Sequence, residues 1–548
     1  QGRSASEERK ACGARDARAA GAECCVGRDR YGVGGKRKDG GVNARGLARS
    51  ESRGRVAGVI EAGDMEECMG YCGEENIEAV HVADVTSTGR MRMFKGERKV
   101  VDLSREFIDS AGAKHYAEAR IGEVEHRDPF ARKIEGATFA ERFANNLRDD
   151  NVLSQRGLIE MFDSTIGRST VLMPFGGRTQ RSETQVSVQK LPTDGYTDTA
   201  SIMAFGYNPY IATWSPYHGA AYAVIEAAAK VVAAGARYEH MRYSYQEYFE
   251  RMTHDARSWG KPLGALLGAL KMQVELGLPS IGGKDSMSGT FQQTNVPPML
   301  MAFGITAVDA RTVISTDLKG AGHRIYLVRH TPLESCMPDT EQLKRNFTFV
   351  SDAIASGKVL AAWSVGFGGV AEGLAKMAFG NGIGVEATID EEKLFEYAYG
   401  SILVECEGTL EYPYAEQIGA TVADAALTIN GVRMPLEELY RANTERFATV
   451  YPDKGVNTAT VMTSAPATGV VAYPGEAVEH PLVYIPVFPG TNCDYDTAKA
   501  FRTAGAEVEM RVLCNIAGDD ILRSIAEMTP HIRPAHTFAL SEGASAGH

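Results

Sequence analysis

The pattern of apolar and polar positions along this chain changes at about residue 56. Residues 1–55 follow neither the 3.6-residue spacing of a helix nor the alternation of a strand. The remainder predicts strands at Val56–Glu61, Ala79–Val85, Arg90–Phe94, Lys99–Leu103, Met299–Val308 and Ile325–Val328, and helices at Asp64–Glu74 and Leu263–Glu275. Strands that alternate with helices in this way indicate an α/β and α+β multidomain fold.

An internal repeat relates two regions that lie about 340 residues apart. A strand at Ser401–Glu405, a short helix at Tyr412–Gly419 and a strand at Thr421–Ile429 follow the order of the first region. The sequence V-R-M-P-L-E-E-L-Y-R, which begins at Val432, parallels K-V-V-D-L-S-R-E-F, which begins at Lys99. So large a spacing is far above the period of a solenoid and indicates duplicated domains.

An apolar helix is predicted after Ser215, a suitable N-cap residue that is followed by proline. Its buried stripe consists of Val224, Ile225, Ala228, Val231 and Val232, and Gly235 ends it. Glu226 and Lys230 lie four residues apart on this helix. Either the two form an ordinary ion pair, or Glu226 is a metal ligand.

The segment S-I-G-G-K-D-S-M-S-G, residues 280–289, carries the densest group of reactive side chains. Gly283 lets the backbone approach a ligand closely, Lys284 supplies a positive charge, and Asp285 can hold a cation. Ser286 and Ser288 add hydroxyl groups. The segment is predicted to be a loop or strand end, where phosphate and nucleotide sites usually lie. Its spacing differs from the phosphate-loop pattern G-x-x-x-x-G-K-[ST], so a plain polar turn is the alternative.

A second candidate anion site is the glycine turn that contains Gly366 and Gly368. The turn leads into a helix that places Val370, Leu374 and Met377 on one face. Backbone N–H groups behind such a turn, at the start of a helix, bind anions readily. Close packing of the turn is the alternative interpretation.

The C-terminal part predicts a separate parallel unit after a linker at residues 463–479. A strand at Leu482–Val487, a helix at Tyr495–Ala504 and a strand at Val508–Leu513 form a βαβ unit. The turn between the first strand and the helix reads F-P-G-T-N-C-D-Y-D and contains Cys493.

The composition narrows the function without assigning one. The net charge is -12 over 548 residues, which favours neither nucleic acid nor an anionic membrane. Residues 1–55 hold 14 Lys and Arg against 7 Asp and Glu, so this segment carries 14 - 7 = +7. It is expected to be disordered and non-native, with a basic arm for nucleic acid or a transit peptide as alternatives. Nine cysteines without a C-x-x-C pair, and no apolar run long enough to span a bilayer, favour a cytoplasmic setting.

Several segments in one order resemble phosphoribosylformylglycinamidine synthase of the large single-chain type. The resemblance runs from about Val56 to Ala539 and rests on many motifs. They are L-S-Q-R-G-L-I-E-M-F-D-S-T-I-G, V-L-M-P-F-G-G, G-Y-N-P-Y, S-P-Y-H-G, S-Y-Q-E-Y-F-E, S-I-G-G-K-D-S-M-S-G, V-G-F-G-G-V-A-E-G-L-A-K-M-A-F-G-N and F-P-G-T-N-C-D-Y-D. Each motif alone is weak, but together in the family's order they form a strong signal.

The resemblance implies the domain organisation of a C-terminal-half fragment. The family carries two copies of an ATP-binding unit similar to aminoimidazole ribonucleotide synthetase, followed by a class I glutamine amidotransferase domain with a flavodoxin-like fold. Residues 56–108 are then the tail of the first copy and residues 109–150 a linker. Residues 151–320 and 321–470 are the two subdomains of the second copy. Residues 480–548 are the start of the amidotransferase domain.

The resemblance also implies a reaction, a ligase step of purine biosynthesis. Formylglycinamide ribonucleotide, glutamine, ATP and water give the amidine, glutamate, ADP and phosphate. ATP activates the amide oxygen as a leaving group, and ammonia from glutamine displaces it. In the second copy the family has an auxiliary ATP/ADP site with Mg²⁺, to which Glu226 and the segments around Lys284 and Gly366 correspond.

This sequence departs from the family at several positions of that auxiliary site. Gln185 and Ser364 each replace an aspartate, Lys230 replaces an asparagine, and Gly366 replaces a serine. Lys230 beside a metal ion is electrostatically unfavourable, which puts Mg²⁺ binding in doubt.

The amidotransferase part departs from the family as well. The family's glutaminase cysteine would lie beyond His548, and Cys493 does not match it. Glu542, Ala544 and His548 depart from the family's glycine-rich loop. No catalytic residue is therefore assigned.

Three hypotheses follow from these observations. The first is a fragment of the synthase that is inactive alone and acts with its missing N-terminal half. The second is an independent ATP enzyme similar to aminoimidazole ribonucleotide synthetase, which would need a complete acidic metal set. The third is a non-catalytic nucleotide-binding or scaffold half.

Overall fold

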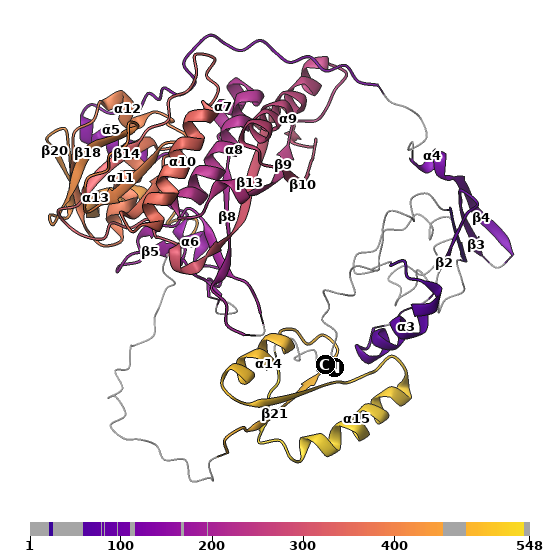
Figure 1. Cartoon of the computed structure of the whole chain (residues 1–548). Helices are drawn as coiled ribbons and strands as arrows, with labels where there is room; N and C mark the ends of the chain where they lie inside the picture. The colour runs from indigo at the N-terminus through magenta and orange to yellow at the C-terminus, as the bar shows by residue number, and fades with distance from the viewer. Residues whose placement is uncertain are drawn as a thin grey trace. The chain divides into compact units, whose positions relative to one another are not determined.

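The computed structural model describes residues 21–25, 58–77, 79, 81, 83–95, 97–109, 116–165, 169–193, 195–452 and 478–541 (Figure 1). The chain divides into two compact units. One contains residues 117–466, and the other combines residues 1–116 with residues 467–548. The first of these, called the central unit below, holds every residue of the predicted nucleotide and metal sites.

The central unit contains a five-stranded sheet covered by helices on one face. Its strands, in spatial order, are β10 (Ser280–Lys284), β9 (Arg242–Tyr248), β13 (Met299–Asp309), β8 (Thr199–Gly206) and β7 (Ser187–Lys190). β13 runs antiparallel to both of its neighbours, and β10 runs parallel to β9. The carboxyl ends of β8, β9 and β10 therefore lie at the same edge of the sheet.

Two long helices, α8 (Pro216–Ala233) and α9 (Ala256–Leu276), pack side by side against this sheet. The Ser215 hydroxyl accepts the His218 N–H at the start of α8, as the sequence predicts. α9 begins earlier than the predicted Leu263, because Asp255 caps its first turn by accepting the N–H of Arg257. It ends at Gly277, whose left-handed φ of 71° closes the helix.

The other face of the five-stranded sheet keeps an apolar strip of side chains exposed. Met203, Phe205 and Ile305 are 41%, 49% and 37% exposed. They are cross-strand neighbours, since Ile305 pairs with Met203, and Phe205 pairs with Phe303. This set of four residues is called the apolar sheet face below.

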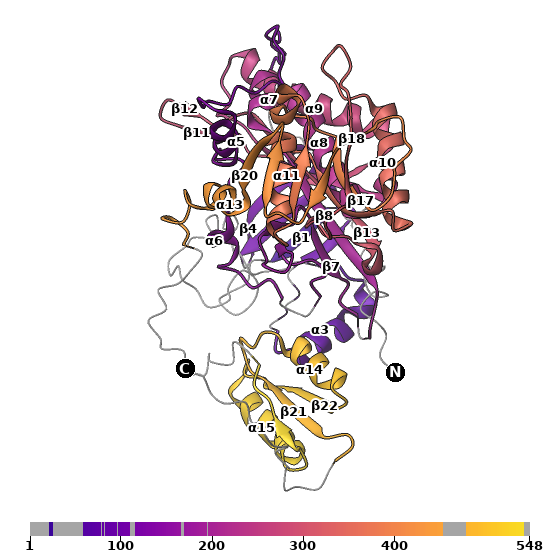
Figure 2. The ribbon, with the colours of Figure 1, turned by 90° about the vertical axis from the view of Figure 1, so that its left-hand side faces the viewer.

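A seven-stranded sheet forms the second half of the central unit (Figure 2). Its strands, in spatial order, are β15 (Val359–Ser364), β17 (Ile402–Cys406), β14 (Arg324–Val328), β18 (Ala415–Val422), β16 (Gly384–Ala387), β19 (Ala426–Ile429) and β20 (Val432–Pro435). α8 and α10 (Thr340–Ala355) pack toward β15, while α11 (Gly369–Phe379), α12 (Glu391–Phe395) and α13 (Leu436–Thr444) belong to a second apolar core.

Two predictions about this unit are wrong. The predicted helix at Tyr412–Gly419 is β18, which pairs with β14 and β16 in the interior of the sheet. Within residues 109–150, predicted as a linker, lies α5 (Phe139–Leu147), whose Phe143 and Leu147 are buried. A capping box between Thr138 and Glu141 fixes the start of α5.

A short hairpin packs against the end of α11. β5 (Phe175–Gly176) and β6 (Ser182–Glu183) form it, and it contacts the end of α11. The Ser182 hydroxyl donates to the Lys376 carbonyl and accepts the Gly380 N–H at 2.9 Å. A Cβ atom on Gly177 would lie 2.4 Å from the Gly380 backbone, so only glycine fits where these two segments of the chain meet.

In the second unit, the N-terminal part contains α3 (Met65–Glu74), β2 (Ala83–Thr86), β3 (Arg90–Lys95), β4 (Arg98–Ser104) and α4 (Arg105–Asp109). The predicted hairpin is confirmed, because β3 and β4 pair antiparallel. The hairpin and α4 follow the same order as β19, β20 and α13, which agrees with the internal repeat. Residues 58–61 are not the predicted strand.

Residues Gly21–Cys25 form β1, which pairs with β2 and β3. The prediction of disorder for residues 1–55 is therefore wrong for these five residues, because their backbone extends the edge of a sheet. The rest of that prediction, and the predicted linker as far as residue 477, lie outside the described residues.

The C-terminal part of the second unit is a parallel three-stranded sheet in the order β22, β21, β23. β21 (Leu482–Val487), α14 (Asp494–Thr503) and β22 (Glu507–Val512) confirm the predicted βαβ unit. α15 (Gly518–Ile532) and β23 (Thr537–Phe538) complete it, and Val483, Ile485 and Ala498 are its buried apolar residues.

Candidate functional site

The predicted phosphate loop begins as the edge strand of the five-stranded sheet. All five residues of β10, including Gly283 and Lys284, are exposed. A Cβ atom on Gly283 would lie 2.5 Å from the Tyr245 carbonyl oxygen, so this glycine is needed for the close approach of β10 to β9. Ser286 and Ser288 follow in a turn, with their hydroxyl oxygens 2.9 Å apart. The structure thus places Lys284, Asp285, Ser286 and Ser288 together at an open edge.

A buried carboxyl group lies beside this loop, on the neighbouring strand. Glu247 is 9% exposed, and its Oε1 atom has no hydrogen-bond partner within the chain. Its backbone carbonyl accepts the Ser286 N–H at 3.1 Å, so Glu247 stands next to Asp285. Burial and then the charge of Asp285 raise the pKa of Glu247 to about 7. The available signal for this site is a glutamate at an inward position of a strand.

The predicted metal ligand Glu226 lies at the same edge of the sheet, beyond the end of β8. Its carboxylate accepts the Tyr207 N–H at 2.9 Å through Oε2 and binds the Lys230 ammonium at 2.8 Å through Oε1. The side chains of Glu226 and Lys230 are only 8% and 11% exposed. Lys230 also donates to the Phe205 carbonyl at 2.9 Å. Of the two interpretations of Glu226, an ion pair or a metal ligand, the structure contains the ion pair with Lys230, and this pair is buried.

The glycine turn faces Glu226. A Cβ atom on Gly366 would lie 3.8 Å from Glu226 Oε1 and 3.9 Å from Glu372 Oε2. Glu372 accepts the Gly368 N–H at 2.8 Å, so the anion-binding capacity of this N–H is already used by a side chain of the same helix. Both glycines are thus at the site, next to carboxylates.

A second buried lysine neutralises Glu372. Lys376 is 4% exposed along its side chain and binds Glu372 at 2.9 Å and Glu183 at 2.7 Å. Burial acts to lower the pKa of Lys376, but the two carboxylates outweigh it and raise that pKa. The sequence analysis did not find Lys376, Glu372 or Glu183. The spacing of Glu372 and Lys376, four residues apart after a glycine turn, was the available signal.

Gln185 and Ser364, two of the positions at which this sequence departs from the family, contact each other. The Gln185 side chain pairs with the backbone of Ser364 in both directions, donating to its carbonyl at 2.9 Å and accepting its N–H at 2.8 Å. The amide therefore joins the first half of the unit to β15. Among the described residues, no three His, Cys, Asp or Glu side chains are grouped so as to hold a metal ion.

These observations test whether a divalent cation suits the residues around Glu226. Both oxygens of Glu226 are engaged, Gln185 is engaged, and an ammonium group lies against the carboxylate. This donor set does not fit Mg²⁺, which requires several free oxygen ligands in an octahedral arrangement. Glu226 as a metal ligand stays a prediction that the side-chain geometry does not favour.

The two halves of the predicted site lie at one edge of the sheet but are not in contact. β9 and β13 separate β10 from β8, which corresponds to about 14 Å across three strand spacings. The two segments could therefore touch different parts of one extended ligand.

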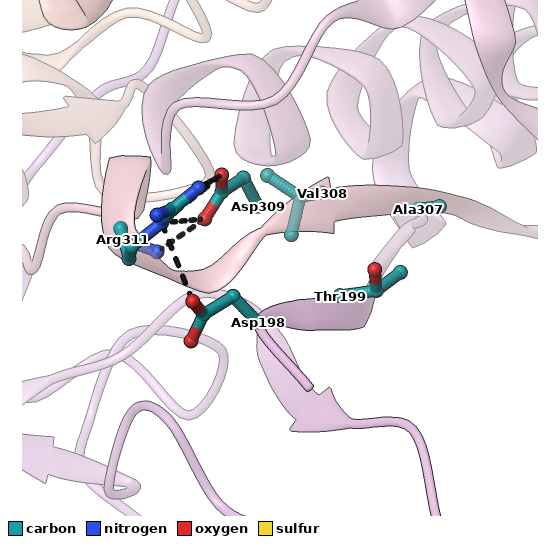
Figure 3. Close-up of a pocket in the computed structure, with 6 residues that line it drawn as sticks. All are labelled: Asp198, Thr199, Ala307, Val308, Asp309 and Arg311. Atoms are coloured by element: carbon teal, nitrogen blue, oxygen red, sulfur yellow. Dashed lines mark hydrogen bonds and ion pairs between the residues drawn. The ribbon is translucent and has the colours of Figure 1, made fainter. Parts of the chain in front are cut away.

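A hollow at the opposite end of β8 and β13 contains none of the predicted residues (Figure 3). It is lined by Asp198, Thr199, Ala307, Val308, Asp309 and Arg311. The Arg311 guanidinium lies 3.6 Å from Asp198 and donates to Asp309. The side-chain and backbone hydrogen bonds from Arg311 lower the pKa of Asp309 to about 2. Since its one cationic group is paired with carboxylates, this hollow is a poor site for phosphate.

In the C-terminal part, Cys493 is exposed and precedes α14 with a left-handed φ of 61°. That Cys493 is not a nucleophile stays a prediction. Glu542, Ala544 and His548 lie outside the described residues. No helix within the described ranges has both the length and the apolar character of a membrane span.

Comparisons with known proteins agree with this arrangement. Residues 480–548 match the CobB/CobQ-like glutamine amidotransferase domain. The phosphoribosylformylglycinamidine synthase subunit PurL of Thermoplasma acidophilum is 24% identical over 382 residues, which cover 65% of this chain and 48% of that protein. The PurL subunit of Thermomicrobium roseum is 24% identical over 453 residues, which cover 75% of this chain and 57% of that protein.

Solved structures share the fold. T. maritima PurL complexed with FGAR has a TM-score of 0.55 at 16% identity, covering 74% of this chain and 58% of that one. T. maritima PurL complexed with ATP has a TM-score of 0.53 at 17% identity, covering 73% and 59%. The resemblance to phosphoribosylformylglycinamidine synthase is confirmed. The fold is that of PurL, followed by a glutamine amidotransferase segment, and the chain spans about half the length of the curated relatives it matches.

Proposed function

We propose that this chain is a portion of a phosphoribosylformylglycinamidine synthase, an ATP-dependent ligase that uses glutamine as its nitrogen donor. One observation carries the proposal: a PurL-like fold and a CobB/CobQ-like glutamine amidotransferase segment occur in the same chain, in that order. An ATP-binding unit joined to an ammonia-producing unit is what an amidation driven by ATP requires.

The proposed reaction converts formylglycinamide ribonucleotide to the amidine. The amide oxygen takes the terminal phosphoryl group of ATP, which releases ADP and turns that oxygen into a good leaving group. Ammonia from glutamine then adds at the same carbon, and phosphate leaves. We assign none of these covalent steps to a residue of the described chain, and we expect the isolated chain to be inactive.

In this proposal the central unit holds a nucleotide without transforming it. Lys284 is exposed at the strand edge and free to meet a phosphate, and Ser286 and Ser288 offer hydroxyl groups beside it. The turn with Gly366 and Gly368 would border the other end of the ligand. ATP or ADP is the proposed ligand. Mg²⁺ is not assigned to Glu226, because Lys230 already binds that carboxylate.

The apolar sheet face supports a partner for the central unit. Exposed Met203, Phe205 and Ile305 on adjacent strands form a surface that normally lies against another protein surface. We propose that the N-terminal half of a synthase of this family covers it. The net charge of -12 and the lack of a membrane-spanning helix in the described ranges are compatible with a cytoplasmic enzyme that binds neither nucleic acid nor membrane.

Two assays on the full chain test the proposal. Calorimetric titration with ADP, with and without Mg²⁺, should detect binding that Lys284→Gln weakens by at least about tenfold, the effect of one lost charge-assisted contact. Lys358→Gln, at an exposed lysine between α10 and β15, is the matched control. No heat at millimolar nucleotide would rule out the nucleotide site and leave the scaffold alternative.

The second assay measures ammonia-dependent turnover of formylglycinamide ribonucleotide and ATP. The chain alone should give none, and addition of the separately produced N-terminal half of a relative should restore it. Turnover by the chain alone would overturn the proposed dependence on a partner half and favour the independent ATP enzyme.

A further inference from the structure

Two buried ion pairs face each other across Gly366. Glu226 with Lys230 lies on one side, and Glu372 with Lys376 lies on the other. A single point, the Cβ position of Gly366, is within 4 Å of a carboxylate oxygen from each pair. The four residues therefore form one cluster, although they come from two helices that serve different sheets.

The cluster has its positive charge built into the chain. Three carboxylates, Glu183, Glu226 and Glu372, meet two ammonium groups, so the formal sum is -3 + 2 = -1. Lys376 bridges two carboxylates from separate segments, as a bound cation would. Lys230 is also held by the Phe205 carbonyl and lies 4.5 Å above the Phe205 ring. Each ammonium group thus has several fixed partners and is shielded from water.

We propose that Lys230 and Lys376 take the place of a divalent cation in this cluster, so that the central unit holds its carboxylates together without bound metal. This role of the two lysines depends on the side chains alone, whether or not the chain takes part in the amidation. This proposal differs from the Mg²⁺ site beside Glu226 that the resemblance to the family implies.

The test uses the full chain and Mn²⁺, a paramagnetic probe for Mg²⁺ sites, followed by electron paramagnetic resonance. Wild type should bind no Mn²⁺ through Glu226, so Glu226→Gln should leave the spectrum unchanged. Lys230→Asn removes the ammonium and offers a neutral oxygen one turn after Glu226, and this variant should gain a Mn²⁺ site. The control is Lys271→Asn, because Lys271 and Glu275 form a pair of the same spacing that is 40% and 31% exposed on α9.

Thermal unfolding gives a second readout of metal binding. The midpoint of wild type should be the same in EDTA and in Mg²⁺, whereas Mg²⁺ should raise that of Lys230→Asn by about 5 °C at saturation. Wild-type binding of Mn²⁺ that Glu226→Gln abolishes would overturn the proposal. A folded Lys230→Asn that binds no Mn²⁺ would also overturn it. If Lys230→Asn does not fold, the wild-type and Glu226→Gln measurements still decide.

Discussion

Glu247 on β9 and Asp285, which directly follows the adjacent parallel strand β10, are neighbouring carboxyl groups, and only Asp285 is open to water. The buried partner is the one whose pKa is raised, to about 7, by burial and by the charge of Asp285. Because the folded state favours the protonated form, Glu247 stabilises the fold fully below the ordinary carboxyl pKa. This stability is lost as the pH rises through about 7.

Replacing Glu247 with glutamine should therefore change stability mainly above neutral pH. We expect Glu247→Gln to be more stable than wild type at pH 8 by about 1–2 kcal/mol, a figure reduced for partial solvent screening, and little different at pH 4.5. Urea unfolding at the two pH values measures this. Asp285→Asn should produce a smaller gain in the same direction. An equal difference at both pH values would contradict the assignment.

Lys376 should be among the most sensitive positions of the central unit. Its replacement with methionine leaves Glu183 and Glu372 without their cation in a buried place, so we expect a loss of about 3–5 kcal/mol. Lys344→Met removes a lysine of an exposed pair with Glu341 and should cost less than about 0.5 kcal/mol. Urea unfolding compares the two variants. Equal losses would show that the Lys376 cluster is not buried in solution.

Protonation of His330 should destabilise the fold at acidic pH. Burial lowers its pKa to about 4, while its Nδ1 donates to the Tyr399 carbonyl and its Nε2 accepts the Asp339 N–H. The folded state favours the neutral ring, so this stability is present above the ordinary pKa of 6.5 and is lost as the pH falls toward 4. His330→Asn should weaken the fold at pH 7 by about 1–3 kcal/mol and flatten the pH dependence between 4 and 6.5. His254→Asn, at an exposed histidine, should do neither.

Two glycines of one turn should differ sharply in their tolerance of alanine. A Cβ atom on Gly366 would meet only carboxylate oxygens at 3.8 and 3.9 Å, which is ordinary contact. Gly369 has a φ of 68°, and its Cβ atom would lie 2.6 Å from the Leu394 carbonyl oxygen. We expect Gly366→Ala to cost less than about 1 kcal/mol and Gly369→Ala more than about 2 kcal/mol. Comparable thermal midpoints for the two variants would contradict this.

The sequence predicted elements whose signals are local. The hairpin at Arg90–Phe94 and Lys99–Leu103 was visible from its pattern, as was the helix capped by Ser215. Tyr412–Gly419 was assigned the wrong element, because pairing with β14 and β16 overrides the local preference of that segment. The start of α9 was missed because its first turns contain Gly260 and Pro262, which usually mark the outside of a helix.

The sequence predicted those contacts of the candidate site whose residues lie close together in the chain. Glu226 and Lys230 are one helical turn apart, so their pairing was foreseeable. Glu183 and Lys376 are 193 residues apart, and only the fold brings them together. Burial decides whether such pairs matter, and burial depends on the packing of two sheets that no short sequence pattern describes.

The hairpin formed by β5 and β6 has a consequence for motion. The hairpin backbone at Gly177 packs so closely against Gly380 that the two segments cannot move past each other. The buried Ser182 hydroxyl is hydrogen-bonded to the end of α11. Opening the central unit between its two sheets would break these hydrogen bonds. It would also break the two hydrogen bonds between the Gln185 side chain and the Ser364 backbone. The two sheets should therefore move as one rigid body, and any gate over a ligand must come from loops at the sheet edge rather than from a hinge between the halves.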